Sequence, residues 1–220
     1  MCGARTYENV FARYNPFETV NLAGNAEYRQ TLTQLRSVVY DWMERTRDGG
    51  LIPEPILEDM GCQYGNKHHV LNQQANMGLV RELIAVIESG EHGERDKLVA
   101  ALRSERASIR YWAATWLGNL KDPSLASHLT MLIDDENPTV RVAAAHALAN
   151  LGEPARYVPL LAEHINSANL ITGMYAITAL EQLGQTAKTA LPAIHTAREN
   201  PYEFTRRIAR RLARKLSNDS

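Results

Sequence analysis

Apolar positions recur with helical spacing along most of this chain. In the most regular stretch, Ala144 and Leu148 lie one turn apart on the same face of an expected helix. Pro138 is well placed to begin that helix, and Gly152 can adopt the left-handed conformation that ends one. A shorter apolar-patterned helix follows, to about Asn166. The pattern therefore predicts two helices joined by a tight turn.

This helix pair is one copy of a repeat. Residues 107–123 align without a gap on residues 138–154, at an offset of 31 residues. The same frame returns at an offset near 32, where Ala176 and Leu180 replace Ala144 and Leu148. Self-similarity at this period predicts a solenoid of helix pairs. We expect a fourth, degenerate copy at 204–216, and second helices at 124–133, 154–166 and 186–196 lining the concave face.

The chain before these repeats is patterned differently. Residues 72–104 predict two amphipathic helices, interpreted as an atypical repeat that closes the stack. A long helix is expected from a cap at Asn25 to about Arg47, followed by a short helix over 54–60 that Gly61 ends. We therefore divide the chain into an N-terminal segment, 1–61, with an irregular start and one long helix, and a repeat domain, 62–220. The predicted fold class is all-α, an α-α superhelix.

Composition narrows the functional class without naming it. Hydrophobic residues make up 45% of the chain and charged residues 22%, which is ordinary for a folded soluble domain and excludes collagenous or disordered classes. The formal net charge of −1 gives no overall attraction to nucleic acid. Two cysteines cannot build a disulfide framework. The sequence holds no apolar run long enough to cross a membrane and no secretion signal at its start.

The period and the pattern of each unit resemble HEAT repeats over about 94–216. In that family, antiparallel helix pairs stack into a curved rod, so the resemblance implies a HEAT-like solenoid, which we expect to be right-handed. Arg110 and Arg141, each after a β-branched residue near the start of a first helix, also fit such repeats. The third copy has Gly173 at this place, so the position is not kept there.

Residues 11–57 resemble the C-terminal end of bacterial type I sulfatases. Those enzymes commonly finish with Asp-Pro-x-Glu-x-x-Asn-Leu and then a helix ending near a Trp. This chain has Asn-Pro-Phe-Glu-Thr-Val-Asn-Leu at 15–22, with Asn15 in place of the usual Asp, and then Asp-Trp-Met at 41–43. The family's catalytic Cys/Ser-x-Pro-x-Arg motif and its metal-binding residues belong to a large N-terminal domain that nothing here matches. Neither Cys2 nor Cys62 stands in such a motif.

The resemblance thus implies a chain without a catalytic domain, either a fragment of a longer gene product or a free-standing relative. No catalytic residue, metal site or cofactor is expected. The leading hypothesis is a non-catalytic scaffold or protein-interaction module related to the C-terminal extension of bacterial sulfatases. Its expected partner is another protein or a sulfatase catalytic domain. The alternative is the C-terminal part of a working sulfatase, completing its fold or substrate groove. A HEAT-type lyase acting on a bilin chromophore has no distinctive residue signal here. The compartment stays unknown: periplasmic if the chain belongs to an exported sulfatase, otherwise cytoplasmic.

Three groups of side chains are candidates for binding. Adjacent His68 and His69, with Cys62 and His92 nearby in sequence, have poor spacing for one metal ion, and ordinary loop roles are favoured. A second group consists of three neighbouring aromatic residues, Tyr111, Trp112 and Trp116. These side chains could contact a sugar or peptide. Burial between repeats is favoured, since one Trp aligns with Ala147 on the inner stripe.

The last predicted helix is strongly basic. Its apolar stripe, from Phe204 to Leu216, leaves the cations facing outward. A solvated terminal cap is the favoured interpretation. The alternative is an anion patch that binds a sulfated polysaccharide, which the sulfatase resemblance favours over nucleic acid. The candidate residues are Arg206, Arg207, Arg210, Arg211, Arg214 and Lys215.

Overall fold

A computed structural model of the chain describes residues 21–217. Residues 11–20 of the sulfatase-like stretch, with positions 15–20 of its motif, lie outside the described residues. The described part of the chain is built from helices and contains no strand, which confirms the all-α prediction. The chain divides into two compact units at Asp48/Gly49, of which the structure describes residues 21–48 and 49–217.

The described part of the first unit is one long helix with a short lead-in turn. Asn25 caps the 3₁₀ turn Ala26–Tyr28, since its side-chain Oδ1 accepts the Glu27 N–H at 3.0 Å, and α2 then spans Arg29–Thr46. The predicted long helix is therefore present. None of the α2 residues is buried, and Trp42 on its apolar stripe stays half exposed.

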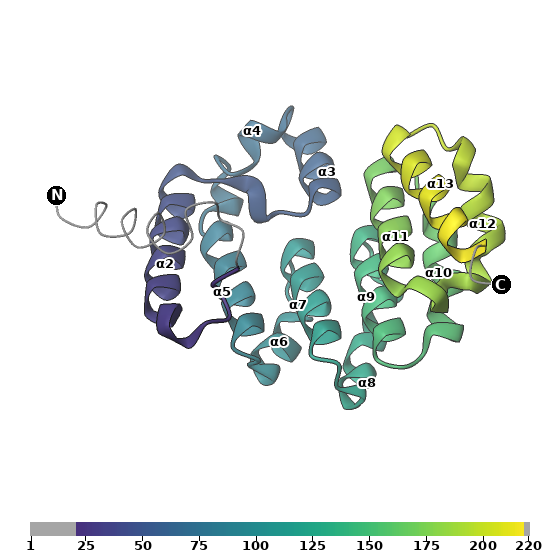
Figure 1. Cartoon of the computed structure of the whole chain (residues 1–220). Coiled ribbons are helices and arrows are strands. Elements are labelled where there is room, and N and C mark those ends of the chain that lie inside the picture. The colour runs from purple at the N-terminus through teal and green to yellow at the C-terminus, as the bar shows by residue number, and fades with distance from the viewer. Residues whose placement is uncertain (1–20, 218–220) are drawn as a thin grey trace. The chain divides into compact units, whose positions relative to one another are not determined.

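The second unit is a series of helices that alternate in direction (Figure 1). The first helices of successive repeats, α7, α9, α11 and α13, pack in chain order. Shorter helices connect them, and α13 stands where the fourth copy was expected. The bounds are α3 Glu54–Tyr64, α4 Lys67–Val70, α5 Leu79–Glu91, α6 Arg95–Ala101, α7 Ala107–Asn119, α8 Ala126–Leu129, α9 Pro138–Asn150, α10 Pro154–His164, α11 Leu170–Leu183, α12 Leu191–Thr196 and α13 Glu203–Ser217.

Small and aliphatic residues on the predicted inner stripes form the core of this unit. Ala144 and Leu148 of α9 are fully buried, as are Ala176 and Leu180 of α11. Small residues let the first helices approach closely: a Cβ added at Gly118 of α7 would lie 2.7 Å from the Cα of Ala147. The stack is therefore held by close helix contacts that larger side chains would block.

The second helices are less regular than predicted. The segment expected as one helix over 124–133 is broken into a 3₁₀ turn, the short α8 and another 3₁₀ turn. The segment over 186–196 likewise begins as a 3₁₀ stretch before α12. Only α10, Pro154–His164, forms most of its expected length.

The start of the second unit differs from the predicted domain boundary. Residues 49–61 were assigned to the N-terminal segment, but they belong to the compact unit that begins at Gly49. The short helix also continues past Gly61 as α3 and ends at Gly65, whose φ of 87° is left-handed. Gly61 is instead a buried point of close approach, where an added Cβ would lie 3.0 Å from the Cγ of Lys67.

Candidate functional site

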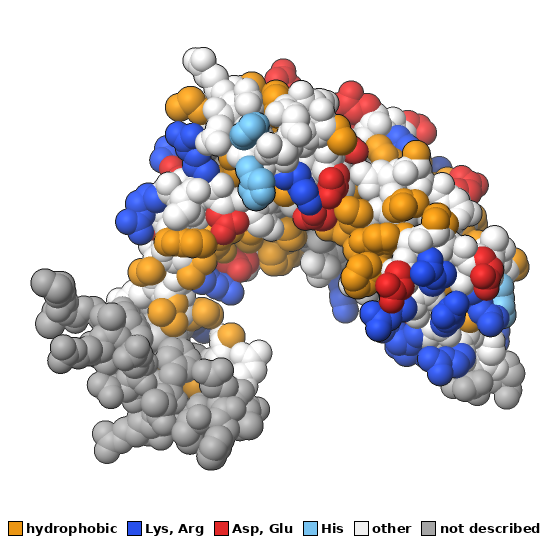
Figure 2. Space-filling view, turned by 90° about the horizontal axis from the view of Figure 1, so that it is seen from above, with side chains coloured by type: hydrophobic (Ala, Val, Ile, Leu, Met, Phe, Trp, Pro, Cys, Tyr) orange, Lys and Arg blue, Asp and Glu red, His pale blue; other side chains and the backbone are white. Residues whose placement is uncertain are grey.

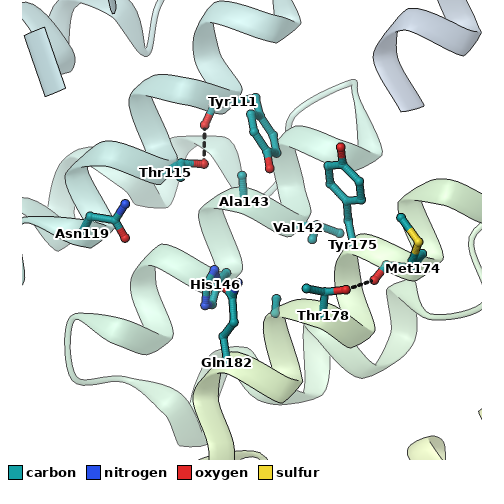
Figure 3. A pocket seen from close by; sticks show the side chains of 11 residues that line it. Tyr111, Thr115, Asn119, Val142, Ala143, His146, Met174, Tyr175, Thr178 and Gln182 are labelled. Atoms are coloured by element: carbon teal, nitrogen blue, oxygen red, sulfur yellow. Dashed lines mark hydrogen bonds between the residues drawn. The ribbon is translucent and has the colours of Figure 1, made fainter. Parts of the chain in front are cut away.

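A pocket of about 370 Å³ lies on one face of the second unit, across α7, α9 and α11 (Figure 3). The first helices of three consecutive repeats line it. The second helices, to which the sequence analysis assigned the concave face, contribute none of its lining residues. These residues are Tyr111, Thr115, Asn119, Val142, Ala143, His146, Met174, Tyr175, Thr178, Ala179 and Gln182.

The hollow exists because the middle repeat has small residues where its neighbours have large ones. In the repeat alignment, Ala143 of α9 occupies the place of Trp112 in α7 and of Tyr175 in α11. Val142 likewise stands between Tyr111 and Met174. A row of side chains that would otherwise be continuous is therefore interrupted at its centre, and the gap is the pocket.

Aromatic rings form one end of the pocket (Figure 3). The Tyr111 and Tyr175 ring centroids lie 6.1 Å apart, and the Trp112 ring meets Tyr111 edge-on at 5.6 Å. Burial raises the pKa of the Tyr111 hydroxyl above its usual range, with a smaller contribution from Tyr175. Tyr111 is therefore a neutral hydroxyl at physiological pH.

Uncharged polar groups form the other end. His146 Nε2 lies 3.1 Å from the Asn150 side-chain nitrogen, and burial lowers the pKa of His146 below its usual value, so the ring is neutral at pH 7. The Thr115 and Thr178 hydroxyls donate to carbonyls of their own helices, those of Tyr111 and Met174. The pocket thus has hydrogen-bonding capacity but no charged side chain in its lining.

A neighbouring segment, residues 49–59, crosses the same face. The Trp112 indole Nε1–H donates to the Leu51 carbonyl at 2.7 Å, and the Glu54 backbone N–H donates to the Tyr175 hydroxyl at 3.3 Å. Asn169 completes the attachment, since its Nδ2 donates to the Pro55 carbonyl at 3.2 Å and to the Asp59 carboxylate at 3.0 Å. We call residues 49–59 the crossing segment. Its attachment fixes both aromatic neighbours of Ala143.

The three aromatic candidates have separate roles. Tyr111 lines the pocket, and Trp112 stands beside it, bonded to the crossing segment. Trp116 packs between α5 and α7, where its ring lies so close to Gly90 that an added Cβ would meet it at 2.1 Å. The Trp116 ring therefore occupies space that is open only because residue 90 is a glycine. Sequence reasoning missed Tyr175, which the repeat alignment pairs with Trp112.

Lys and Arg side chains gather at one end of the second unit (Figure 2), and the basic residues of α13 differ in their partners. Glu181 of α11 accepts a bidentate ion pair from Arg211, at 2.6 and 2.5 Å, and lies 3.5 Å from Lys215 Nζ. Arg207 lies 3.8 Å from Glu203. Arg210 and Arg214 have no acidic partner within residues 21–217. Because some of the six candidate cations are paired with acidic side chains, the net positive charge of this surface is smaller than the sequence predicts.

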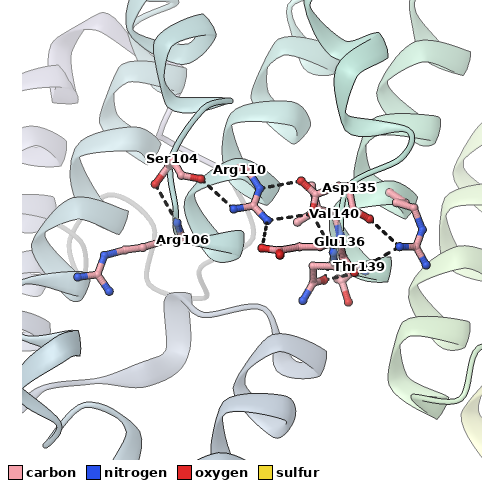
Figure 4. Close-up of polar contacts among 9 residues, drawn as sticks. Ser104, Arg106, Arg110, Asp135, Glu136, Thr139 and Val140 are labelled. Atoms are coloured by element: carbon pink, nitrogen blue, oxygen red, sulfur yellow. Dashed lines mark hydrogen bonds and ion pairs between the residues drawn. The ribbon is translucent and has the colours of Figure 1, made fainter.

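Arg206 belongs to a structural series rather than to this surface. Its Nη1 donates to the Asn200 carbonyl, six residues earlier, at 2.7 Å. Arg141 donates to Asp135 O at 2.6 Å, and Arg110 to Ser104 O at 2.8 Å, with the same separation (Figure 4). Each arginine thereby holds the turn that precedes its own helix. The signal was available, since Arg206 lies 33 residues after Gly173 in the same frame.

The strongest polar cluster of the second unit is built on Arg110 (Figure 4). Its Nε and Nη2 bond both oxygens of Asp135, at 2.7 and 2.9 Å. Both side chains are buried, with exposed fractions of 8% and 5%. Because the carboxylate also accepts the Asn137 N–H at 2.9 Å, the cluster fixes the turn that leads into α9.

Within the described part of the chain, no three His, Cys, Asp or Glu side chains come together as a metal site. None of the helices there is both long and apolar enough to span a membrane.

Comparison with known proteins agrees with the repeat assignment. Residues 95–172 match the family HEAT repeats. The fold is a HEAT-like helical repeat. That match covers α6 to the start of α11, and therefore includes α7 and α9 of the pocket. No curated protein matches the chain.

Proposed function

We propose that this HEAT-like repeat is a non-catalytic interaction module that binds a protein partner on the face formed by α7, α9 and α11. The observation that carries the proposal is the pocket at Ala143, which consecutive repeats line from equivalent positions. HEAT repeats commonly mediate protein interactions, and a concave site with apolar walls and a few polar groups suits recognition.

The side chains in the pocket support binding rather than catalysis. His146, the titratable base of the lining, is paired with Asn150. The Thr115 and Thr178 hydroxyls of the lining donate to backbone carbonyls of their own helices. An activated nucleophile would instead need its hydroxyl directed to a base. We therefore propose that the chain alone has no hydrolytic activity.

The test fills the pocket without touching its rim. The Ala143→Trp variant places a large ring where the neighbouring repeats already carry Trp112 and Tyr175. The matched control, Ala155→Trp, adds the same ring to an exposed position of α10 outside the pocket. Proteins enriched from an extract of the source cells, then purified and titrated by calorimetry, should bind the wild type and the control but not Ala143→Trp.

Equal binding to all three proteins would contradict the proposal, because the partner would then use another surface. If Ala143→Trp fails to fold, as judged by circular dichroism, the double variant Asn119→Ala, Gln182→Ala replaces it. Both of its side chains are exposed at the pocket's edge and contribute little to the core.

A second role is supported by residues 11–57, which resemble the end of bacterial sulfatases. We propose on this basis that the module accompanies a sulfatase catalytic domain, with which it would complete a fold or a substrate groove. The isolated chain should give no turnover of an aryl sulfate ester beyond that of the Ala143→Trp protein. Turnover well above that background would contradict the non-catalytic proposal. Tight binding of a purified sulfatase catalytic domain would support the second role.

A further inference from the structure

The pocket face already holds one piece of polypeptide, the crossing segment. Three of its attachments go to main-chain groups, those of Leu51, Glu54 and Pro55, and a fourth joins Asn169 to the Asp59 carboxylate. The side chains that make them, from Trp112, Tyr175 and Asn169, are uncharged. On this face, neutral side chains therefore bind main-chain groups of the crossing segment directly beside an open pocket.

The open pocket offers the same kind of group. The Asn119 and Gln182 carboxamides have no hydrogen-bond partner within residues 21–217. Tyr175 accepts from Glu54, so its own hydroxyl proton remains available. Carboxamides both donate and accept, as peptide groups do. These side chains can therefore pair with the N–H and C=O groups of an incoming chain.

The pocket's neutrality restricts what can enter. Its lining includes no Lys, Arg, Asp or Glu, and burial keeps His146 and Tyr111 uncharged at pH 7. A charged side chain would lose its hydration there without gaining a counter-charge, which is costly. An apolar side chain would instead replace water against Val142, Ala143 and Met174.

We propose that the pocket binds an uncharged, extended segment of the partner protein and accommodates one apolar side chain over Ala143. This inference rests on the proposed function and names its ligand class. Neighbouring packed helices lie roughly 8–10 Å apart, and an extended chain advances about 3.3 Å per residue. About three residues would therefore span from one helix of the face to the next.

A random twelve-residue peptide display library, selected on the full chain, supplies the probe. Enriched peptides should share one apolar position in an uncharged stretch. Their affinity, measured by fluorescence anisotropy, should fall about tenfold or more in Ala143→Trp and stay unchanged in Ala155→Trp. Replacing the shared apolar residue by Asp, Lys or phosphotyrosine should weaken binding to the wild type by a similar factor. The Asn119→Ala, Gln182→Ala variant should also weaken it, because the backbone contacts are lost.

Several outcomes would overturn the inference. Enriched peptides that carry a required charge at the shared position would do so, as would the absence of any peptide whose binding depends on Ala143. Binding of an oligosaccharide on a glycan array, lost only in Ala143→Trp, would assign the pocket to sugar instead. The proposed function would survive a failed peptide selection if a purified partner protein still lost its affinity in Ala143→Trp.

Discussion

The turns that precede the first helices, here called the loop edge, repeat the same contacts, whereas the pocket face formed by α7, α9 and α11 varies from repeat to repeat. At the loop edge, Arg110, Arg141 and Arg206 make the same hydrogen bond to a carbonyl six residues earlier, with nearly the same length. On the pocket face, the place occupied by Ala143 holds Trp or Tyr in the adjacent repeats. Residues that recur in each repeat stabilise the helix stack. The position that differs between repeats, Ala143, creates the pocket on its surface.

This difference separates stability from binding in a way that substitutions can measure. Changes at the loop edge should reduce the free energy of unfolding, since they remove buried polar partners. Changes on the pocket face should alter binding with little effect on stability, because most of its polar groups lie at an open surface.

The largest loss is expected from Asp135→Ala. Removal of this carboxylate leaves the buried Arg110 guanidinium without its bidentate partner, and breaking such a pair costs about 3–5 kcal/mol. The matched control is Asp134→Ala, the exposed neighbouring carboxylate, which should change the free energy of unfolding by no more than about 0.5 kcal/mol. Urea unfolding followed by circular dichroism measures both. Similar losses in the two variants would mean that the pair does not hold the turn.

The next largest effect is expected from Gly173→Ala, at the repeat position where the arginine is missing. Alanine is normally better than glycine inside a helix by about 1 kcal/mol. Here, however, the added Cβ would lie 2.4 Å from the Ile165 carbonyl oxygen, and such overpacking costs about 1–3 kcal/mol. We therefore expect a net loss, measured as a lower Tm. A higher Tm would show that α10 moves away at little cost.

That glycine also illustrates what sequence could and could not provide. Periodicity predicted the helices, their pairing and the stack, since apolar spacing and small residues report local structure and burial directly. Gly173 looked like a decayed position. The backbone carbonyl of Ile165 gives it a physical reason, because no side chain fits there.

The pocket could not be predicted in the same way. It depends on the small size of Ala143 relative to residues 31 and 32 positions away, and on a crossing segment attached from outside the repeats. The repeat alignment shows that Ala143 is smaller than its equivalents. The attachment of the crossing segment is a long-range contact, which local sequence patterns do not indicate. The same limit explains why Arg206 was grouped with the surface cations.

A smaller effect is expected from pH. Burial lowers the pKa of His146 and of His164 in the folded protein, with Arg141 adding to the shift of His164. The unfolded chain therefore binds more protons than the folded chain as pH falls below about 6.5, so stability decreases with falling pH. Tm measured between pH 7.5 and 5 should fall less in His146→Gln than in the wild type.

An unchanged slope in His146→Gln would contradict the assignment of a buried neutral ring on the pocket face. The effect is smaller than that of Asp135 because a neutral histidine loses no ion pair; it only resists protonation.

The smallest effect on stability is expected from the outward cations of α13. Arg210→Gln and Arg214→Gln should each change the free energy of unfolding by no more than about 0.5 kcal/mol, since neither side chain has an acidic partner within residues 21–217. Arg206→Gln should cost more, about 1 kcal/mol or above, because two carbonyl contacts at 2.7 and 2.8 Å are lost.

Retention on immobilised heparin distinguishes the outward cations of α13 from Arg206. If α13 binds sulfated polysaccharide, the Arg210 and Arg214 variants should elute at lower salt while Arg206→Gln elutes like the wild type. If all three variants elute at the same salt concentration as the wild type, α13 is a solvated terminal cap and does not bind sulfated polysaccharide.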